Sequence, residues 1–348
     1  MIDWLSIVVP CAHPAPIDAG KVLSVGASGD VEWMSSKRQT VTGSFSSGLT
    51  VRTVQRSVDP CTHLEISGNP VKFFQGHNLW GADDVPGLVM ATMEHLVGVL
   101  SLAPTDLDRL AWSVGDVQIT RVDVTQSFHL QSRGEVLAWL RAAEQTAHLS
   151  HRGRGQLVKG STLYFGQHSR RWSLKLYSKG QEIHARGHGQ DAILNLPHAV
   201  AWADRTLRAE LTIRSMELKR MALDQVAAWK DVDGVPFDAS VLLRDRLGSM
   251  TMTTARTLPE DVIASLTTGQ HNAYLAWAAG NDLRETMSRP SFYRLRSKLL
   301  PHGVDIATLM PKEVSNVVPL YRVLEAVPVS VPDWAVGTPL YFEPRRVA

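Results

Sequence analysis

The sequence predicts an α+β fold, in which a central antiparallel sheet with covering helices is followed by a smaller, α-rich C-terminal domain. Three observations support this prediction. From about residue 1 to 220, most apolar runs are short, alternate with polar residues and end at Gly, Ser or Asn. Helical spacing interrupts this part twice, and beyond about residue 221 it predominates. We therefore expect a sheet-rich domain over residues 1–220 and a smaller helical domain over 221–348, although no linker-like segment marks the boundary.

The individual elements follow from local patterns. The opening residues predict a first strand over 4–9. Apolar side chains at i, i+3 and i+4 intervals predict two helices that cover the sheet, over 85–99 and 133–147. The same spacing predicts six short helices in the second domain, over 222–230, 259–265, 272–279, 282–287, 291–300 and 311–317.

Composition excludes several classes of protein. The chain has 348 residues, of which 44% are hydrophobic and 20% charged, so it is neither disordered nor collagenous. No apolar run is long enough to cross a membrane, and the N-terminus lacks the basic start of a secretory signal. Cys11 and Cys61 form no CxxC pair, which disfavours a zinc site or a disulfide framework. The expected compartment is the cytoplasm.

Three predicted strands each place one carboxylate on their polar face, because side chains at i and i+2 share a face. These carboxylates belong to Glu65, Asp123 and Glu210. For any one strand, a surface salt bridge with a neighbouring arginine is the simpler interpretation. If the strands are neighbours, the three acids and His77 would suit a hard divalent cation, Mg²⁺ or Mn²⁺.

A tyrosine lies on a basic face of another predicted strand. Residues 172–179 alternate, so that Tyr177 points outward with Lys175 and Lys179 while the apolar side chains point inward. From residue 145 to 181 there is no acid but there are seven basic residues, Arg152, Arg154, Lys159, Arg170, Arg171, Lys175 and Lys179. A solvated basic hairpin is one interpretation, but the purity of the charge favours contact with a phosphate backbone.

Tyr177 is therefore a candidate nucleophile. Nearby cations favour the phenolate form of a tyrosine, whose ordinary pKa of about 10 makes it a weak nucleophile at neutral pH. With a metal ion polarising a phosphodiester and Lys179 neutralising the developing charge, Tyr177 could attack phosphorus. The expected product is a covalent phosphotyrosyl intermediate, so the reaction would be a transesterification.

The segment 282–300 has the pattern of a helix, a short turn and a second helix. Ser291 is a candidate N-cap of the second helix, and the apolar stripe of Phe292, Leu295 and Leu299 predicts its buried face. A helix-turn-helix with a recognition helix is one interpretation, and an ordinary amphipathic pair with a solvated basic face is equally consistent. The candidate DNA-contacting side chains are Arg294, Arg296 and Lys298.

Several short motifs follow one another in order along most of the chain. They are Met1-Ile2-Asp3, Leu64-Glu65-Ile66, Gln75-Gly76-His77-Asn78, Thr120-Arg121-Val122-Asp123, Tyr177-Ser178-Lys179, Leu207-Arg208-Ala209-Glu210, Asn316-Val317-Val318-Pro319-Leu320 and Pro332-Asp333-Trp334. Taken together, these motifs make the sequence resemble the gene II replication initiation endonucleases of filamentous bacteriophages. The resemblance implies that residues 1–220 form the catalytic domain and residues 221–348 a helical DNA-binding or regulatory domain.

This resemblance implies an enzyme of the host bacterial cytoplasm that binds the phage origin and nicks the plus strand of supercoiled double-stranded DNA. It implies that Tyr177 links the protein to the 5′ end and that the displaced single-stranded DNA is rejoined as a circle. A host helicase is a candidate partner. The resemblance also implies metal ligands, first Glu65 and His77, then Asp123, with Glu210 either a ligand or a partner of Arg208.

The chain departs from the wider class of rolling-circle initiators, because their His-hydrophobe-His motif is replaced by His63-Leu64-Glu65. The family also makes a second product from an internal start, for which Met287 is the candidate. Two alternatives remain open at this point: a non-catalytic DNA-binding replication regulator, and a metal-dependent nuclease that activates water and needs no tyrosine.

Overall fold

The fold is built on one nine-stranded sheet in which all neighbouring strands are antiparallel. The computed structural model describes residues 1–45, 47–55, 61–185, 190–252, 260–279, 281–302, 304–307 and 327–345. Across the sheet the strands are β10 (Gln156–Val158), β11 (Thr162–Phe165), β12 (Trp172–Ser178), β13 (Thr206–Arg214), β7 (Gln118–His129), β1 (Ile2–Pro10), β6 (His63–Gly68), β5 (Gly48–Thr53) and β4 (Gln39–Thr42).

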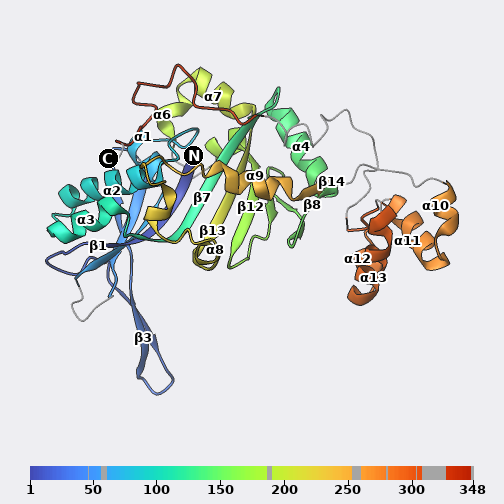
Figure 1. The fold of residues 1–348 in the computed structure, drawn as a ribbon, viewed down its shortest axis with the longest axis horizontal. Helices are drawn as coiled ribbons and strands as arrows, with labels where there is room; N and C mark the ends of the chain where they lie inside the picture. The colour runs from blue at the N-terminus through green and yellow to red at the C-terminus, as the bar shows by residue number, and fades with distance from the viewer. Residues whose placement is uncertain are drawn as a thin grey trace.

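The apolar face of this sheet is covered by helices, as Figure 1 shows. Its apolar side chains share one core with those of α2 (Val85–Val99), α3 (Asp106–Val114), α4 (Arg133–Thr146), α8 (Ser215–Arg220) and α9 (Ser240–Gly248). The α+β prediction is thus confirmed, and so are the helices expected over 85–99 and 133–147. We did not predict α3 or α9. A Thr105–Asp108 capping box marks the start of α3, and it is a signal that the sequence contained.

The opposite face of the sheet is polar, and the register between β7 and β13 sets its pattern. Asp123 pairs with Thr212, and Thr125 pairs with Glu210, so these side chains point to the same side. The alternation of Val122 and Val124 into the core fixes this arrangement. The polar faces predicted for the two strands therefore form one continuous surface.

Smaller elements surround the ends of the sheet. A second sheet is formed by β14 (Met250–Met252), β8 (Ala147–Leu149) and β9 (Gly153–Arg154), and a hairpin of β2 (Lys21–Val25) and β3 (Val31–Ser36) projects from the body in Figure 1. Near one end of the long strands lie α1 (Pro70–Gln75), α5 (Lys179–Ile183), α6 (Asp191–Leu194) and α7 (Pro197–Asp204).

A separate hydrophobic cluster holds the C-terminal helices together, with Trp277, Leu283, Phe292 and Leu299 at its centre. The helices are α10 (Glu260–Ser265), α11 (Thr268–Ala278), α12 (Leu283–Thr286) and α13 (Arg289–Leu299). They confirm a helical C-terminal region, but α12 is a single turn, shorter than the first helix of a helix-turn-helix. The helix predicted over 311–317 lies outside the described residues.

The core of the sheet extends past residue 220. Val226, Trp229 and Leu243 pack in the same core as the strands. Only a 3₁₀ turn, Val226–Trp229, forms where we predicted a helix over 222–230. The division into 1–220 and 221–348 remains a prediction. Within the described ranges, no helix is long and apolar enough to cross a lipid bilayer.

Candidate active site

A cleft of about 680 Å³ opens on the polar face of the sheet. Strands β1, β7, β12 and β13 and helix α5 contribute its walls. The ionisable side chains that line it include those of Asp3, Asp123, Lys175, Tyr177, Glu182 and Glu210. The structure therefore brings together two of the predicted acids and the predicted nucleophile.

Tyr177 lies on β12, where it pairs with Thr162 on one side and Arg208 on the other. The predicted alternation is confirmed, since Leu174 and Leu176 are in the core while Tyr177 lines the cleft. The ammonium of Lys175 lies 4.3 Å from the centre of the tyrosine ring. Within the described part of the chain, the Tyr177 hydroxyl has no hydrogen-bond partner, so a substrate could approach it without breaking one.

The phenol of Tyr177 is nevertheless not activated in this state. Its side chain is 4% exposed, and burial raises its pKa well above the usual 10. The nearby carboxylate of Glu210 raises the pKa further, while Arg208 lowers it. Our expectation that the surrounding cations favour the phenolate was therefore wrong, because burial dominates.

Lys179 is also placed differently from our expectation, because β12 ends at Ser178 and Lys179 starts α5. Its side chain is fully buried instead of pointing outward. The Nζ atom donates to Asn78 Oδ1 at 2.6 Å and lies 2.6 Å from Glu182 Oε2. Burial lowers the pKa of Lys179 to about 8, although Glu182 opposes this. Near neutral pH a fraction of this amine is therefore uncharged.

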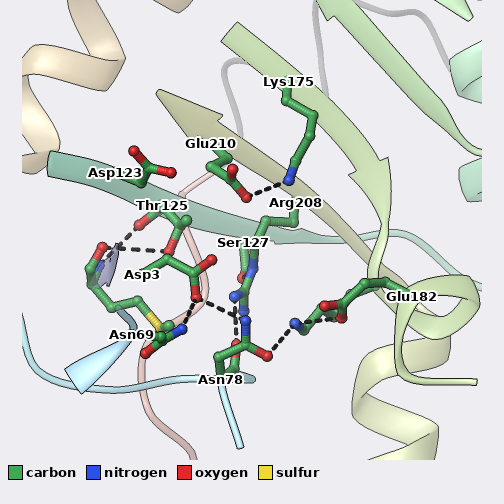
Figure 2. A network of polar contacts seen from close by, with 12 residues as sticks. Asp3, Asn69, Asn78, Asp123, Thr125, Ser127, Lys175, Glu182, Arg208 and Glu210 are labelled. Carbon is green, nitrogen blue, oxygen red and sulfur yellow. Dashed lines mark hydrogen bonds and ion pairs between the residues drawn. The ribbon is translucent and has the colours of Figure 1, made fainter. Parts of the chain in front are cut away.

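A polar network connects this lysine through Asn78 to Asp3 on the first strand. Figure 2 shows Asn78, Asp3 and Glu182 in this network. Asp3 accepts hydrogen bonds from Asn69 Nδ2 at 2.9 Å and from Asn78 Nδ2 at 2.8 Å. Arg208 donates to Ser127 Oγ and to two carbonyl oxygens of the loop that carries Asn78. Asp3 and Asn78 were not among our candidate residues, although both belong to the motifs that carry the family resemblance.

The two predicted acids in the cleft each contact a cation. Arg121 donates to both carboxylate oxygens of Asp123, at 2.9 and 2.6 Å, and Lys175 Nζ lies 2.7 Å from Glu210 Oε2. Lys175, not the expected Arg208, is thus the partner of Glu210. Burial raises the pKa of both acids, and the charge of Asp3 adds to the effect on each.

The other two predicted metal ligands lie elsewhere. Glu65, on β6, forms ion pairs with Arg38 at 2.5 Å and Arg52 at 2.6 Å. His77 is fully buried, and hydrogen bonds occupy both of its ring nitrogens. The predicted set of four ligands is therefore not assembled. Among the described residues, no three His, Cys, Asp or Glu side chains are close enough together to hold a metal ion.

The loop around His77 is held by the C-terminal strap, which we define as residues 327–345. The Leu340 carbonyl accepts hydrogen bonds from His77 Nε2 and Trp80 Nε1, each at 2.9 Å. The Phe342 N–H donates to Gln75 Oε1 at 2.8 Å. Figure 1 shows this segment returning to the end of the sheet near α6 and α7. The strap thus buries the loop whose Asn78 contacts Asp3 and Lys179.

We expect His77 to make folding stability dependent on pH. Nδ1 accepts from the Leu79 N–H, so the folded state requires neutral imidazole, and burial lowers the pKa from 6.5 to about 4. The stabilising contribution is complete above pH 6.5 and is lost as pH falls toward 4, by about 3 kcal/mol in total. In urea unfolding, the free energy of unfolding of His77→Gln should fall correspondingly less between pH 6.5 and pH 4. His168→Gln, at an exposed site, should retain the wild-type dependence, and equal curves for all three proteins would contradict the assignment.

The predicted DNA-contacting residues divide into two groups. Five contact acids or rings in the folded chain: Arg152 stacks on Trp172, Arg154 pairs with Asp282, Arg171 with Glu217, Lys175 with Glu210 and Arg296 with Asp305. The segment 145–181 contains no acid, but folding brings acids from other segments into ion pairs with its basic residues. The exposed cations without an ion pair among the described residues are Lys159, Arg170, Arg294 and Lys298.

The predicted second helix of the C-terminal pair forms as α13. Phe292 and Leu299 are buried and Leu295 is partly buried, as predicted. The N-cap is Ser288 instead of Ser291. Arg296 is directed to Asp305, at 2.7 Å, so it is not one of the projecting cations.

Comparison with known proteins finds matches along most of the chain. Residues 1–232 match the family model of the N-terminal region of these proteins, and residues 260–341 match the model of their C-terminal region. The chain is 38% identical to the replication-associated protein of Enterobacteria phage I2-2 over 338 residues, 96% of each protein. The chain therefore belongs to the family of gene II replication-associated proteins, as the resemblance implied.

A solved structure of a rolling circle replication initiator protein from Geobacillus stearothermophilus is also similar. It shares 13% sequence identity, and the match covers 75% of this chain and 89% of that protein with a TM-score of 0.32.

Proposed function

We propose that this chain initiates rolling-circle replication of a phage genome. It would bind the origin on supercoiled double-stranded DNA, nick the plus strand through Tyr177, and rejoin the displaced single strand into a circle. The position of Tyr177 carries the proposal: its hydroxyl has no hydrogen-bond partner within the described part of the chain, and it lines a polar cleft beside Lys175. Membership of a family of replication-associated proteins supports it. The host cytoplasm and a host helicase belong to the same proposal.

The chemical step would be a phosphoryl transfer. The phenol oxygen of Tyr177 attacks phosphorus, the bond from phosphorus to the 3′ oxygen breaks, and the protein becomes joined to the 5′ phosphate. The phenol proton passes to the amine of Lys179, whose Nζ lies 6.0 Å from the centre of the Tyr177 ring and whose pKa is lowered to about 8. The 3′ oxygen leaves as a hydroxyl after taking a proton from solvent. Reversal of this step by a new 3′ hydroxyl would rejoin the strand.

Divalent metal dependence, on Mg²⁺ or Mn²⁺, remains part of the proposal. The carboxylates of Asp3, Asp123 and Glu210 line the cleft, and oxygen donors of this kind suit either ion. In this conformation Arg121 and Lys175 neutralise two of them, and the three do not converge on one point. We therefore assign no ligand set and no step to the ion.

The test is to incubate the protein with supercoiled origin DNA and Mg²⁺ or Mn²⁺, with EDTA as a control. Denaturing gels with and without protease would then show whether protein is joined to the 5′ end. A protease-sensitive adduct supports the proposal. Nicks without an adduct, also after rapid quenching, would favour a water nucleophile. Binding without nicking would favour a non-catalytic regulator.

Two basic residues of the same sequence stretch should affect DNA binding differently. Lys159 is exposed at the cleft and has no ion pair among the described residues, whereas Arg154 pairs with Asp282 at 2.9 Å. We expect Lys159→Gln to lower the slope of log affinity against log salt by about 1, because one phosphate contact is lost. Arg154→Gln should leave this slope unchanged. Salt titrations of origin binding measure both, and an equal effect of the two variants would contradict the assignment.

A further inference from the structure

Trp4 is an aromatic residue on the polar face of the sheet. Its neighbours Ile2 and Leu5 point into the core, while Trp4 is half-buried and lines the same cleft as Tyr177. A tryptophan placed for packing would lie on the apolar side. Trp4 instead presents its ring where Asp3 and Tyr177 present their polar groups.

The orientation of this ring is fixed from below. The indole Nε1 donates to the hydroxyls of Ser6 and Ser67, each at 3.1 Å, and these two hydroxyls are 2.6 Å apart. Both serines are buried. Two buried hydroxyls thus hold the indole at the cleft surface through its N–H. A tryptophan that only packs in the core would not need these hydrogen bonds.

Arg121 lies over one face of the Trp4 ring. The centre of its guanidinium lies 5.2 Å from the centre of the Trp4 ring, and both carboxylate oxygens of Asp123 hold it. Asp123 is 2% exposed, whereas the side chain of Arg121 is 38% exposed. A buried acid therefore holds a partly exposed cation over one face of a fixed aromatic ring.

The distance to the nucleophile follows from the register. Tyr177 pairs with Arg208, which pairs with Ser127, and Trp4 pairs with Asp123. Three strand spacings and four residues along a strand separate the two side chains, which is roughly 19 Å. A single strand whose scissile phosphate lies at Tyr177 would therefore reach Trp4 a few nucleotides away.

We propose that Trp4 and Arg121 form a base-stacking subsite for single-stranded DNA, in which one unpaired base stacks on the indole and Arg121 contacts the adjoining phosphate. The inference rests on the proposed function and specifies where the substrate strand lies. Stacking suits this place because every base has a flat π face, and a neighbouring cation neutralises the backbone. The subsite would hold the strand on the cleft after the origin duplex opens.

The test couples a change in the protein to a change in the DNA. Oligonucleotides spanning the nick site, each with one abasic position, are titrated against wild type and Trp4→Leu. We expect one position at which loss of the base weakens wild-type binding by roughly 5- to 100-fold. That penalty should disappear in Trp4→Leu and persist in Trp4→Phe, which retains a ring. The control is Trp33→Leu, a change of an exposed tryptophan on β3, which should behave as wild type.

A measurement on the unmodified protein avoids dependence on how the variants fold. 5-Iodouracil placed at the sensitive position should cross-link to the peptide that contains Trp4. Equal abasic penalties in wild type and Trp4→Leu, or a cross-link that maps to another strand, would overturn the subsite. Neither result would affect the covalent adduct at Tyr177, whose absence would instead reject the proposed function.

Discussion

Changing Tyr177 to Phe is expected to abolish nicking and the covalent adduct while origin binding stays near wild type. Removal of a nucleophile costs on the order of 10⁴-fold or more in rate, because no other group can form the same intermediate. The fold should tolerate the change, since the phenol oxygen has no hydrogen-bond partner in the described part of the chain and the buried ring is retained. Rapid-quench nicking assays and gel-shift titrations on supercoiled origin DNA measure the two effects.

Tyr164→Phe is the matched control. Tyr164 lines the same cleft and pairs with Lys175 across β11 and β12, so the variant removes a phenol oxygen from the same cleft wall, at a partly buried position. It should retain the adduct and nick at close to the wild-type rate. An adduct that survives in Tyr177→Phe but is lost in Tyr164→Phe would move the nucleophile to the neighbouring strand. If the adduct persists in both variants, the nucleophile lies outside β11 and β12.

Sequence patterns predicted the strand face of Tyr177 correctly because the relevant information is local. Alternation along β12 determines which side chains share a face, and the buried Leu174 and Leu176 leave one register for the strand. The same rule failed two residues later. Lys179 begins a helix with Ser178 as its N-cap, so strand alternation no longer applies and the side chain turns into a buried network.

The four predicted metal ligands lie apart for a different reason. A sequence shows which residues share a strand face but not which distant groups pack against them. Glu65 forms an ion pair with Arg52 of the adjacent strand β5. His77 is hydrogen-bonded to the carbonyl of Leu340, which lies more than 250 residues away in the sequence. Asp3 was overlooked because a lone acid near the N-terminus has no local pattern, and its role appears once β1 lies beside β7.

The same limit applies to the fold. The long, periodic helices α2 and α4 were predictable because their apolar stripe is continuous over several turns. Alternation also indicated a sheet, but strand order depends on pairings that carry no sequence label. The strap is the extreme case. Its role depends on contacts with residues 75–80, which form only when the distant C-terminal segment packs against them in the folded protein.

Removal of the C-terminal strap is expected to reduce both stability and nicking. A chain that ends after residue 326 loses three hydrogen bonds to Gln75, His77 and Trp80, which together contribute about 3 kcal/mol to the free energy of unfolding. It also loses the stacking of Phe342 on Phe74, at 4.4 Å between ring centres. Because the released loop carries Asn78, the nicking rate should fall on the order of 100-fold through misplacement of Lys179. Urea unfolding and single-turnover nicking measure the two effects.

Two further experiments separate positioning by the strap from general destabilisation. Phe342→Ala should lower the nicking rate, whereas Val336→Ala, at a side chain of the strap that is 53% exposed, should not. A synthetic peptide of residues 327–345 added to the truncated protein should restore nicking with saturable dependence on its concentration, because the contacts need proximity and not a covalent link. Wild-type nicking by the truncated protein would show that the loop keeps Asn78 in place by itself. Failure of the peptide to restore the rate, despite measured binding, would show that the strap stabilises the fold without positioning Lys179.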